Sequence, residues 1–213
     1  LGIFTRPKII ELGEFEGKSI LSARDFTCTQ VTEIAKLAAL LEKLEITHYH
    51  PLDGKIAVTA FFEASTRTRT SFESAMLRLD GKIISIPDGG LTGQAKGESL
   101  QDIGEMFNAY CDLVIMRHTD TDSLERILEN LRVPLINAGN GSGEHPTQAL
   151  ADWYALLKWK PELADPKPEG APKLHLGILG TPGSMRAVKS FLLTALLFKD
   201  HIAGVTVISE MAD

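Results

Sequence analysis

The sequence predicts an α/β protein: a mostly parallel sheet flanked by helices, with the start of a second α/β domain. Short, nearly continuous apolar runs alternate along the chain with longer segments whose apolar residues recur at helical spacing. Continuous apolar runs are typical of parallel strands, which are buried on both faces. The repeated order of strand and helix then favours one parallel sheet with helical connections.

The first helix is expected over residues 30–46, where Val31, Ile34 and Ala38 recur at helical spacing. KIAVTAFF, residues 55–62, is the first expected strand, and the helix after it has Ser65 or Thr66 as its N-cap. Further strands are expected over 82–86, 112–118, 134–139, 174–180 and 205–209. Further helices are expected near 100–107, over 122–131 and 146–159, and from about Met185.

We expect a boundary at residue 160, with one domain over 1–160 and part of another over 161–213. PELADPKPEGAPK, residues 161–173, is rich in proline and charge, as linkers are. The residues beyond it are too few to form a stable core alone, so we expect the sequence to be a fragment. It begins at Leu1, and we recognise no secretory leader.

Composition excludes several classes of function. A net charge of −6 and a pI of about 5.5 argue against a general nucleic-acid binder, so any cationic site must be local. No apolar run approaches the roughly 18 residues that a membrane span needs. Cys28 and Cys111 lack metal-ligand or redox spacing, which favours two reduced cysteines in a cytoplasmic protein.

FFEASTRTRTSFESAM, residues 61–76, places hydroxyl and cationic side chains where a strand runs into a helix. The hydroxyls of Ser65, Thr66 and Thr68 interleave with Arg67 and Arg69. A helix N-terminus offers unpaired N–H groups and about half a positive charge, so this segment predicts a site for a phosphate-like anion. The alternative is a capped helix with surface arginines. It is not a P-loop, because G-x-x-x-x-G-K-[ST] is absent.

Polar residues also follow two later strands. Arg117 and His118 end the run VIMRH, and each side chain is either solvated or directed at a ligand. His145 and Gln148 open a helix and are three residues apart, so they share a face. A capping role and a functional role for this pair both stay open at this point.

GILGTPGS, residues 177–184, raises a rival interpretation as a dinucleotide-binding turn. Its glycines, Gly177, Gly180 and Gly183, are spaced G-x-x-G-x-x-G rather than G-x-G-x-x-G. We therefore predict a tight turn between a strand and a helix. Bound NADH fluorescence would distinguish the two interpretations.

Three segments in one order, FFEASTRTRTSFE, VIMRH and HPTQALAD, resemble the signature segments of the aspartate and ornithine carbamoyltransferases. The resemblance covers essentially the whole chain. It is closer to the aspartate branch, because Glu63 and Lys96 match residues that are typical of that branch.

The resemblance implies roles for the residues that match these segments. It implies that four residues bind the phosphate of carbamoyl phosphate: Ser65, Thr66, Arg67 and Thr68. Thr68, Arg117 and His145 would reach the carbonyl oxygen, and Gln148 would reach the amide. Arg67, Thr68, Arg117, His145 and Gln148 would thus be the catalytic set.

Three further residues follow from the same resemblance. Thr92 and Lys96 would reach the active site of a neighbouring subunit in a homotrimer with shared sites, and Arg186 would bind a carboxylate of the acceptor. The implied reaction carbamoylates L-aspartate in pyrimidine biosynthesis, in the cytoplasm and without metal or cofactor. Alternatives are another acceptor amine such as ornithine, or a non-catalytic anion-binding paralogue or truncated form. Regulatory subunits stay open as partners.

Overall fold

The computed structural model describes residues 2–43, 50–89, 93–165, 170 and 172–209. The contacts of its backbone divide the chain into two compact units, each assembled from segments far apart in the sequence. Unit 1 comprises Leu1–Glu16, Ser22–Leu44 and Glu144–Asp213, and unit 2 comprises Gly17–Leu21 and Glu45–Gly143. Over the described ranges, no helix is long and apolar enough to cross a membrane.

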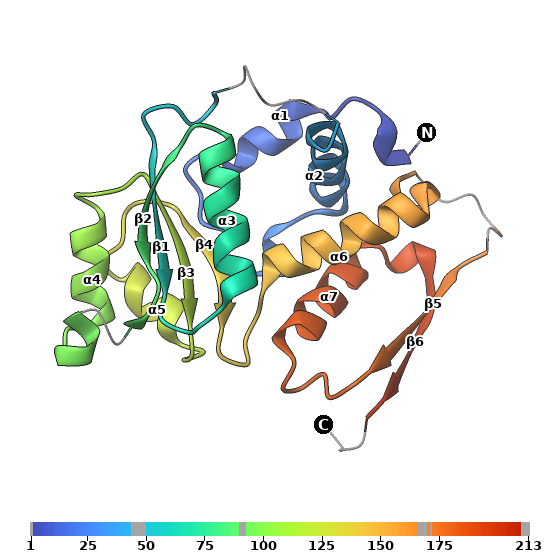
Figure 1. The fold of residues 1–213 in the computed structure, drawn as a ribbon. Helices are drawn as coiled ribbons and strands as arrows, with labels where there is room; N and C mark the ends of the chain where they lie inside the picture. Colours follow the sequence, from blue (N-terminus) through green and yellow to red (C-terminus); the bar gives the residue numbers. More distant parts are fainter. Residues whose placement is uncertain (1, 44–49, 90–92, 166–169, 171, 210–213) are drawn as a thin grey trace. The chain divides into compact units, whose positions relative to one another are not determined.

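Unit 2 contains the predicted parallel sheet with helices on both faces. Its strands are β1 (Ile56–Phe61), β2 (Lys82–Ile86), β3 (Leu113–His118) and β4 (Leu135–Asn140), in the order β2-β1-β3-β4. Its helices are α3 (Thr66–Arg78), α4 (Leu100–Phe107) and α5 (Ser123–Leu128). Figure 1 shows α3 on one face of the sheet and α4 and α5 on the other.

The two faces of this sheet carry separate apolar clusters. Under α3 lie Ala57, Phe61, Met76, Ile115 and Ala138. The cluster under α4 and α5 contains Val58, Ala60, Leu100, Ile103, Phe107, Val114, Met116, Leu124, Ile127, Leu131 and Leu135. Because side chains alternate along a strand, the side of β3 that carries Ile115 also carries Arg117, and the opposite side carries His118.

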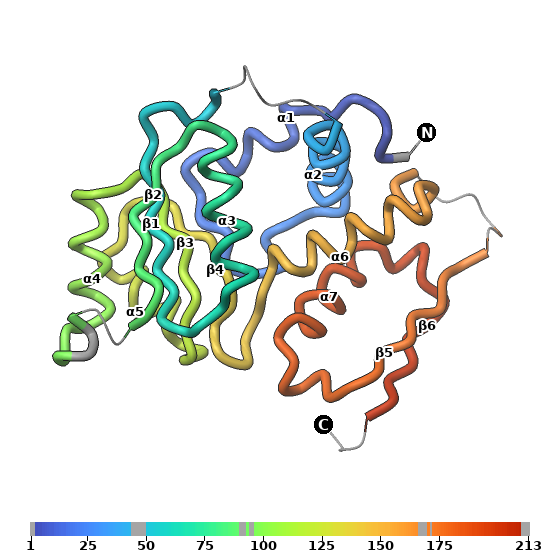
Figure 2. The backbone as a smooth tube through the Cα atoms, in the orientation of Figure 1, coloured from blue at the N-terminus to red at the C-terminus, as the bar shows by residue number. Residues whose placement is uncertain are grey.

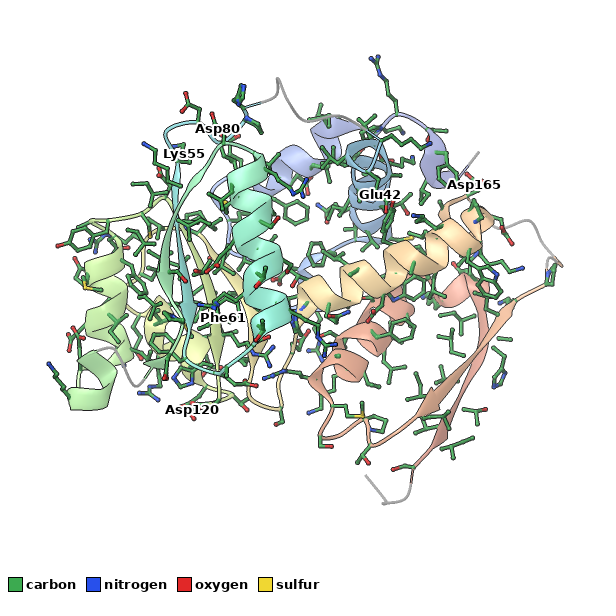
Figure 3. The ribbon with its side chains drawn as sticks, in the orientation of Figure 1. Glu42, Lys55, Phe61, Asp80, Asp120 and Asp165 are labelled. Carbon is green, nitrogen blue, oxygen red and sulfur yellow. The ribbon has the colours of Figure 1, made fainter. Side chains whose placement is uncertain are left out.

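The strand order fixes where a ligand is expected. From β1 the chain passes through α3 to β2 on one side, and later returns through α4 to β3 on the other. Open α/β sheets bind ligands at such a switch point, outside the carboxyl ends of the strands. Figure 3 labels Phe61 and Asp120 near this end of the sheet, and Lys55 and Asp80 near the opposite end.

Unit 1 combines helices with a short parallel strand pair. Its helices are α1 (Ile9–Leu12), α2 (Cys28–Leu41), α6 (Pro146–Trp159) and α7 (Arg186–Leu197). Its strands, β5 (Leu174–Leu179) and β6 (Ile202–Ile208), run parallel and are joined through α7 (Figure 2). Helix α7 packs against α6, and Phe198, the residue after α7, stacks on Trp153 with ring centroids 4.3 Å apart.

Several short 3₁₀ helices complete the described segments. They are η1 (Gly2–Phe4), η2 (Gly13–Phe15), η3 (Ala23–Asp25), η5 (Gly93–Lys96), η6 (Pro161–Ala164) and η7 (Lys199–His201). In η6, Leu163 is buried, so the first part of the predicted linker is packed structure rather than linker.

One further prediction differs from the structure, and one pairing in the structure was not predicted. The helix predicted over 30–46 begins at Cys28, because Thr27 and Gln30 form a capping box, and it ends at Leu41. Its predicted last residues, 44–46, lie outside the described part of the chain. No local pattern indicated that Ile20 would form a parallel bridge with Ile136 at the edge of the sheet.

Candidate functional site

The N-terminus of α3 is open. Ser65 occupies the N-cap position with φ −158° and ψ 95°, but its side chain makes no capping hydrogen bond. At α2 and α4, by contrast, the hydroxyls of Thr27 and Ser99 accept hydrogen bonds from backbone N–H groups at 3.2 and 3.1 Å. Within the described residues, nothing accepts a hydrogen bond from the backbone N–H groups of residues 66–68.

The charge at this helix end is cationic. The first turn of α3 contains no acidic residue. Arg67 is exposed and forms no ion pair with any residue that the structure describes. Arg69 lies near β2, with Nη1 3.5 Å from Ser85 Oγ, so the two arginines have separate surroundings. Free N–H groups, hydroxyls and an unneutralised guanidinium together fit a phosphate-like anion.

Arg117 adds a second cation at the carboxyl end of the adjacent strand. Its Nη2 donates a hydrogen bond to Glu63 Oε1 at 2.7 Å, and Nη1 lies 3.4 Å from the carbonyl oxygen of Ala138. The side chain is only 12% exposed, and its Nε is buried without a hydrogen-bond partner in the described structure. Protein contacts therefore fix this guanidinium at the strand end and leave one of its N–H groups unsatisfied.

His118 and its neighbour Arg117 have different surroundings, and the sequence alone could not distinguish them. It lies on the opposite face of β3, where its ring packs 5.3 Å from that of Phe62 and its Nδ1 accepts a hydrogen bond from the N–H of Asp120. Burial lowers the pKa of His118, and the nearby Asp120 carboxylate opposes that shift. A neutral, buried imidazole of this kind supports the fold rather than a ligand.

The loop residues expected to act on a neighbouring subunit are described only in part. Lys96 ends η5 and is exposed. Thr92 lies outside the described residues, as do Gly90 and Leu91.

His145 and Gln148 belong to unit 1, at the start of α6. His145 is the N-cap residue and is 6% exposed, and its side chain makes no capping hydrogen bond. Its backbone N–H donates to Ser190 Oγ at 2.8 Å, and Thr147 Oγ1 lies 3.3 Å from its Nδ1. Pro146 occupies the first helical position, where its missing N–H costs nothing. The imidazole therefore stands at a helix N-terminus without acting as its cap.

A hydrogen-bond network that sequence analysis missed holds this helix start. Glu144 accepts hydrogen bonds from Ser22 Oγ at 2.6 Å and from the backbone N–H of Ala23 at 2.8 Å. Ser190, fully buried on α7, lies 3.3 Å from Glu144 and holds the backbone of His145. Arg186, the first residue of α7, is one helical turn before Ser190.

The turn before α7 is tight, as predicted. Gly180 has φ +134°, and the backbone N–H groups of Ser184 and Met185 both donate to the carbonyl of Thr181 at 3.2 Å. Elsewhere in the described ranges, no group of three or more His, Cys, Asp or Glu side chains is placed to hold a metal ion.

Comparison with known proteins decides the family. Residues 18–158 match the sequence profile described as "Aspartate/ornithine carbamoyltransferase, carbamoyl-P binding domain". The chain belongs to this family. The match spans the open N-terminus of α3, Arg117 and the start of α6.

Similar proteins point to one branch of the carbamoyltransferase family. The chain is 40% identical over 190 residues to the aspartate carbamoyltransferase catalytic subunit of Thermococcus kodakarensis, and 37% identical over 188 residues to that of Methanopyrus kandleri. Each match covers 88% of this chain and 58% of the relative. The chain thus spans less than two thirds of the length of these relatives.

Solved structures of aspartate transcarbamoylase from Trypanosoma cruzi are also similar to this chain. One, in complex with carbamoyl phosphate and aspartate, has a TM-score of 0.76 and 32% identity, covering 90% of this chain and 56% of that one. Another, in complex with N-(phosphonacetyl)-L-aspartic acid, has a TM-score of 0.77 and 31% identity, covering 91% and 59%.

The position of His118 predicts a pH dependence of stability. Its pKa is lowered on folding, so as pH falls through about 6.5 the unfolded chain binds a proton before the folded chain does. The stability that neutral His118 contributes is therefore present above about pH 6.5 and is lost as pH falls towards the lowered folded pKa. His118→Gln should be destabilised by about 1–3 kcal/mol at pH 8, and by less at pH 5.5.

Urea unfolding at both pH values measures this difference. Val114→Ala, a buried change without a titrating group on the same strand, is the control, and its loss of stability should be equal at the two pH values. A constant gap between wild type and His118→Gln at the two pH values would contradict the assignment.

Proposed function

We propose that the protein is an aspartate carbamoyltransferase. It transfers the carbamoyl group of carbamoyl phosphate to the amino group of L-aspartate, giving N-carbamoyl-L-aspartate and phosphate, a step of pyrimidine biosynthesis. The observation that carries the proposal is the open, cationic N-terminus of α3 at the switch point of a sheet in this family. The match to aspartate carbamoyltransferase catalytic subunits supports the choice of reaction.

The phosphate group is assigned to the start of α3. Ser65, Thr66 and Thr68 supply hydroxyls, residues 66–68 supply backbone N–H groups, and Arg67 supplies the charge. A hydrogen bond to a charged group contributes roughly 1.5–3 kcal/mol, so several together hold the donor substrate firmly. When phosphate leaves, the same groups stabilise its negative charge.

The carbonyl oxygen of the donor is assigned to Arg117, His145 and Thr68. When the acceptor amine attacks the carbonyl carbon, negative charge develops on this oxygen. Preorganised donors stabilise that charge most effectively where water is excluded, and Arg117 is already fixed and largely buried. A neutral imidazole at His145 can polarise the oxygen by donating one hydrogen bond. Gln148 is assigned to the amide of the carbamoyl group.

The acceptor is assigned to L-aspartate through Arg186. A dicarboxylate needs cations, and a planar guanidinium binds a carboxylate by two hydrogen bonds at once. Trypanosoma cruzi structures with aspartate and with N-(phosphonacetyl)-L-aspartic acid support this choice. We include in the proposal a carbamoyl-phosphate-binding domain over 1–160 and an aspartate-binding domain from residue 161.

The assembly is proposed to be a cytoplasmic homotrimer with shared active sites. Thr92 and Lys96 would reach the site of a neighbouring subunit, consistent with the exposure of Lys96 on η5. The relatives carry the name "catalytic subunit", which supports regulatory subunits as further partners.

Removing Arg67 tests the phosphate site. In the full-length protein, Arg67→Ala should lower kcat/KM by about a hundredfold or more, because charge stabilisation in the transition state is lost. Arg78→Ala, at the other end of α3, is the control and should retain activity within about twofold. Circular dichroism checks that both variants fold. Equal activity of the two variants would refute the assignment of phosphate to Arg67.

The choice of acceptor amine is tested directly. The full-length protein is assayed for ureido product with carbamoyl phosphate and, in turn, aspartate, ornithine, putrescine and N-acetylornithine. Aspartate should give the fastest turnover, because Arg186 matches a carboxylate whereas a second amine would need an acidic partner. Faster turnover with any of the other amines would overturn the aspartate assignment. No turnover with any amine, together with phosphate binding, would favour a non-catalytic paralogue.

A further inference from the structure

Asp152 is a half-buried carboxylate on α6, one helical turn beyond Gln148. The side-chain amide nitrogen of Gln148 donates a hydrogen bond to Asp152 Oδ1 at 3.0 Å. Residues at i and i+4 on a helix are neighbours, so this contact belongs to the geometry of α6 itself. Over the described residues, neither side chain makes any other hydrogen bond.

This contact decides which way the glutamine amide faces. A glutamine amide carries a donor NH₂ and an acceptor oxygen, and a half-turn of the amide exchanges them. An ionised carboxylate can only accept hydrogen bonds, so it must be approached by the NH₂. Asp152 therefore directs the Gln148 oxygen away from itself. Reversing the amide would bring two oxygens together beside a carboxylate that has no other partner among the described residues.

The partial burial of Asp152 strengthens its control over the orientation of the Gln148 amide. Burial raises the pKa of Asp152, and the hydrogen bond from Gln148 opposes that shift. The glutamine NH₂ thus replaces part of the water that a carboxylate would otherwise bind. Turning the amide away would leave a half-buried charge without its hydrogen bond, which disfavours that orientation.

An outward-facing amide oxygen recognises an N–H donor and offers nothing to a methyl group. We propose that Asp152 is a positioning residue that fixes the oxygen of Gln148 to read the NH₂ of the carbamoyl donor. The inference rests on the proposed function, in which Gln148 meets this amide. Acetyl phosphate is the informative comparison, because a methyl group stands where carbamoyl phosphate has its NH₂. A site that hydrogen-bonds the NH₂ discriminates against the analogue that lacks it.

The experiment measures discrimination rather than activity alone. Dissociation constants of carbamoyl phosphate and acetyl phosphate are measured by calorimetry on the full-length protein and its variants. For Asp152→Ala, the preference for carbamoyl phosphate should fall about tenfold, the value of one oriented hydrogen bond. Asp152→Asn, whose amide oxygen can still accept from Gln148, should recover most of the preference. Asp152→Leu, which branches at Cγ as aspartate does but has no polar atoms, replaces the alanine variant if that one does not fold.

A double variant separates positioning from a general structural role. In the Gln148→Ala background the preference is already lost, so adding Asp152→Ala should lower it no further. An equal additional loss in that background, or an unchanged preference in Asp152→Ala alone, would overturn the inference. If Gln148→Ala itself leaves the preference intact, both the role of Gln148 and this inference fail. If Gln148→Ala lowers the preference and Asp152→Ala does not, the inference alone fails.

Discussion

The site in unit 2 depends on three backbone N–H groups at the start of α3, those of residues 66–68, which have no acceptor among the described residues. A serine at the N-cap normally accepts a hydrogen bond from this first turn, and the loss of such a cap costs about 1 kcal/mol. Ser65 stands in the right place and does not cap. The helix is held instead by its apolar face, where Met76 belongs to the buried apolar cluster on this side of the sheet and Phe72 packs against that cluster. Packing far from the helix start thus leaves its N–H groups open for an anion.

The order of the strands brings the other cation to the same end. With β3 beside β1, the backbone N–H of Phe62 donates to the carbonyl of Arg117 at 2.8 Å, so the segment leading to Ser65 is tied to the end of β3. The same alternation along β3 sends Arg117 to the α3 face and His118 to the opposite one. One strand therefore supplies a charged side chain on one face of the sheet and a neutral packing residue on the other, in successive positions.

Much of the fold could be predicted because parallel strands are buried on both faces and so appear as continuous apolar runs. KIAVTAFF and KIISI became β1 and β2 with small changes at their ends. Local signals failed where distant partners decide the outcome. Ile20 pairs with β4 through long-range hydrogen bonds, and Leu163 is buried inside a segment whose composition suggested a linker.

In the candidate site, too, features carried by neighbouring residues could be predicted from the sequence, and features that depend on distant contacts could not. STRTR could be recognised because the residue types and the strand-to-helix junction are adjacent in sequence. The i,i+4 spacing of Gln148 and Asp152 was also visible there, but which atom faces which depends on burial. The contacts of Glu144 with Ser22 and Ser190 join segments far apart in the chain, and no local pattern announces them.

The most direct measurement of the central claim uses backbone amides as reporters. The full-length protein, selectively ¹⁵N-labelled at arginine, threonine and glutamine, is titrated with inorganic phosphate and followed by TROSY NMR. The amide signals of Arg67 and Thr68 should shift in a saturable manner, because their N–H groups are open. The amide of Gln30, already bonded to Thr27 at the start of α2, should stay in place. Saturable binding of phosphate with no change at Arg67 and Thr68 would contradict the account.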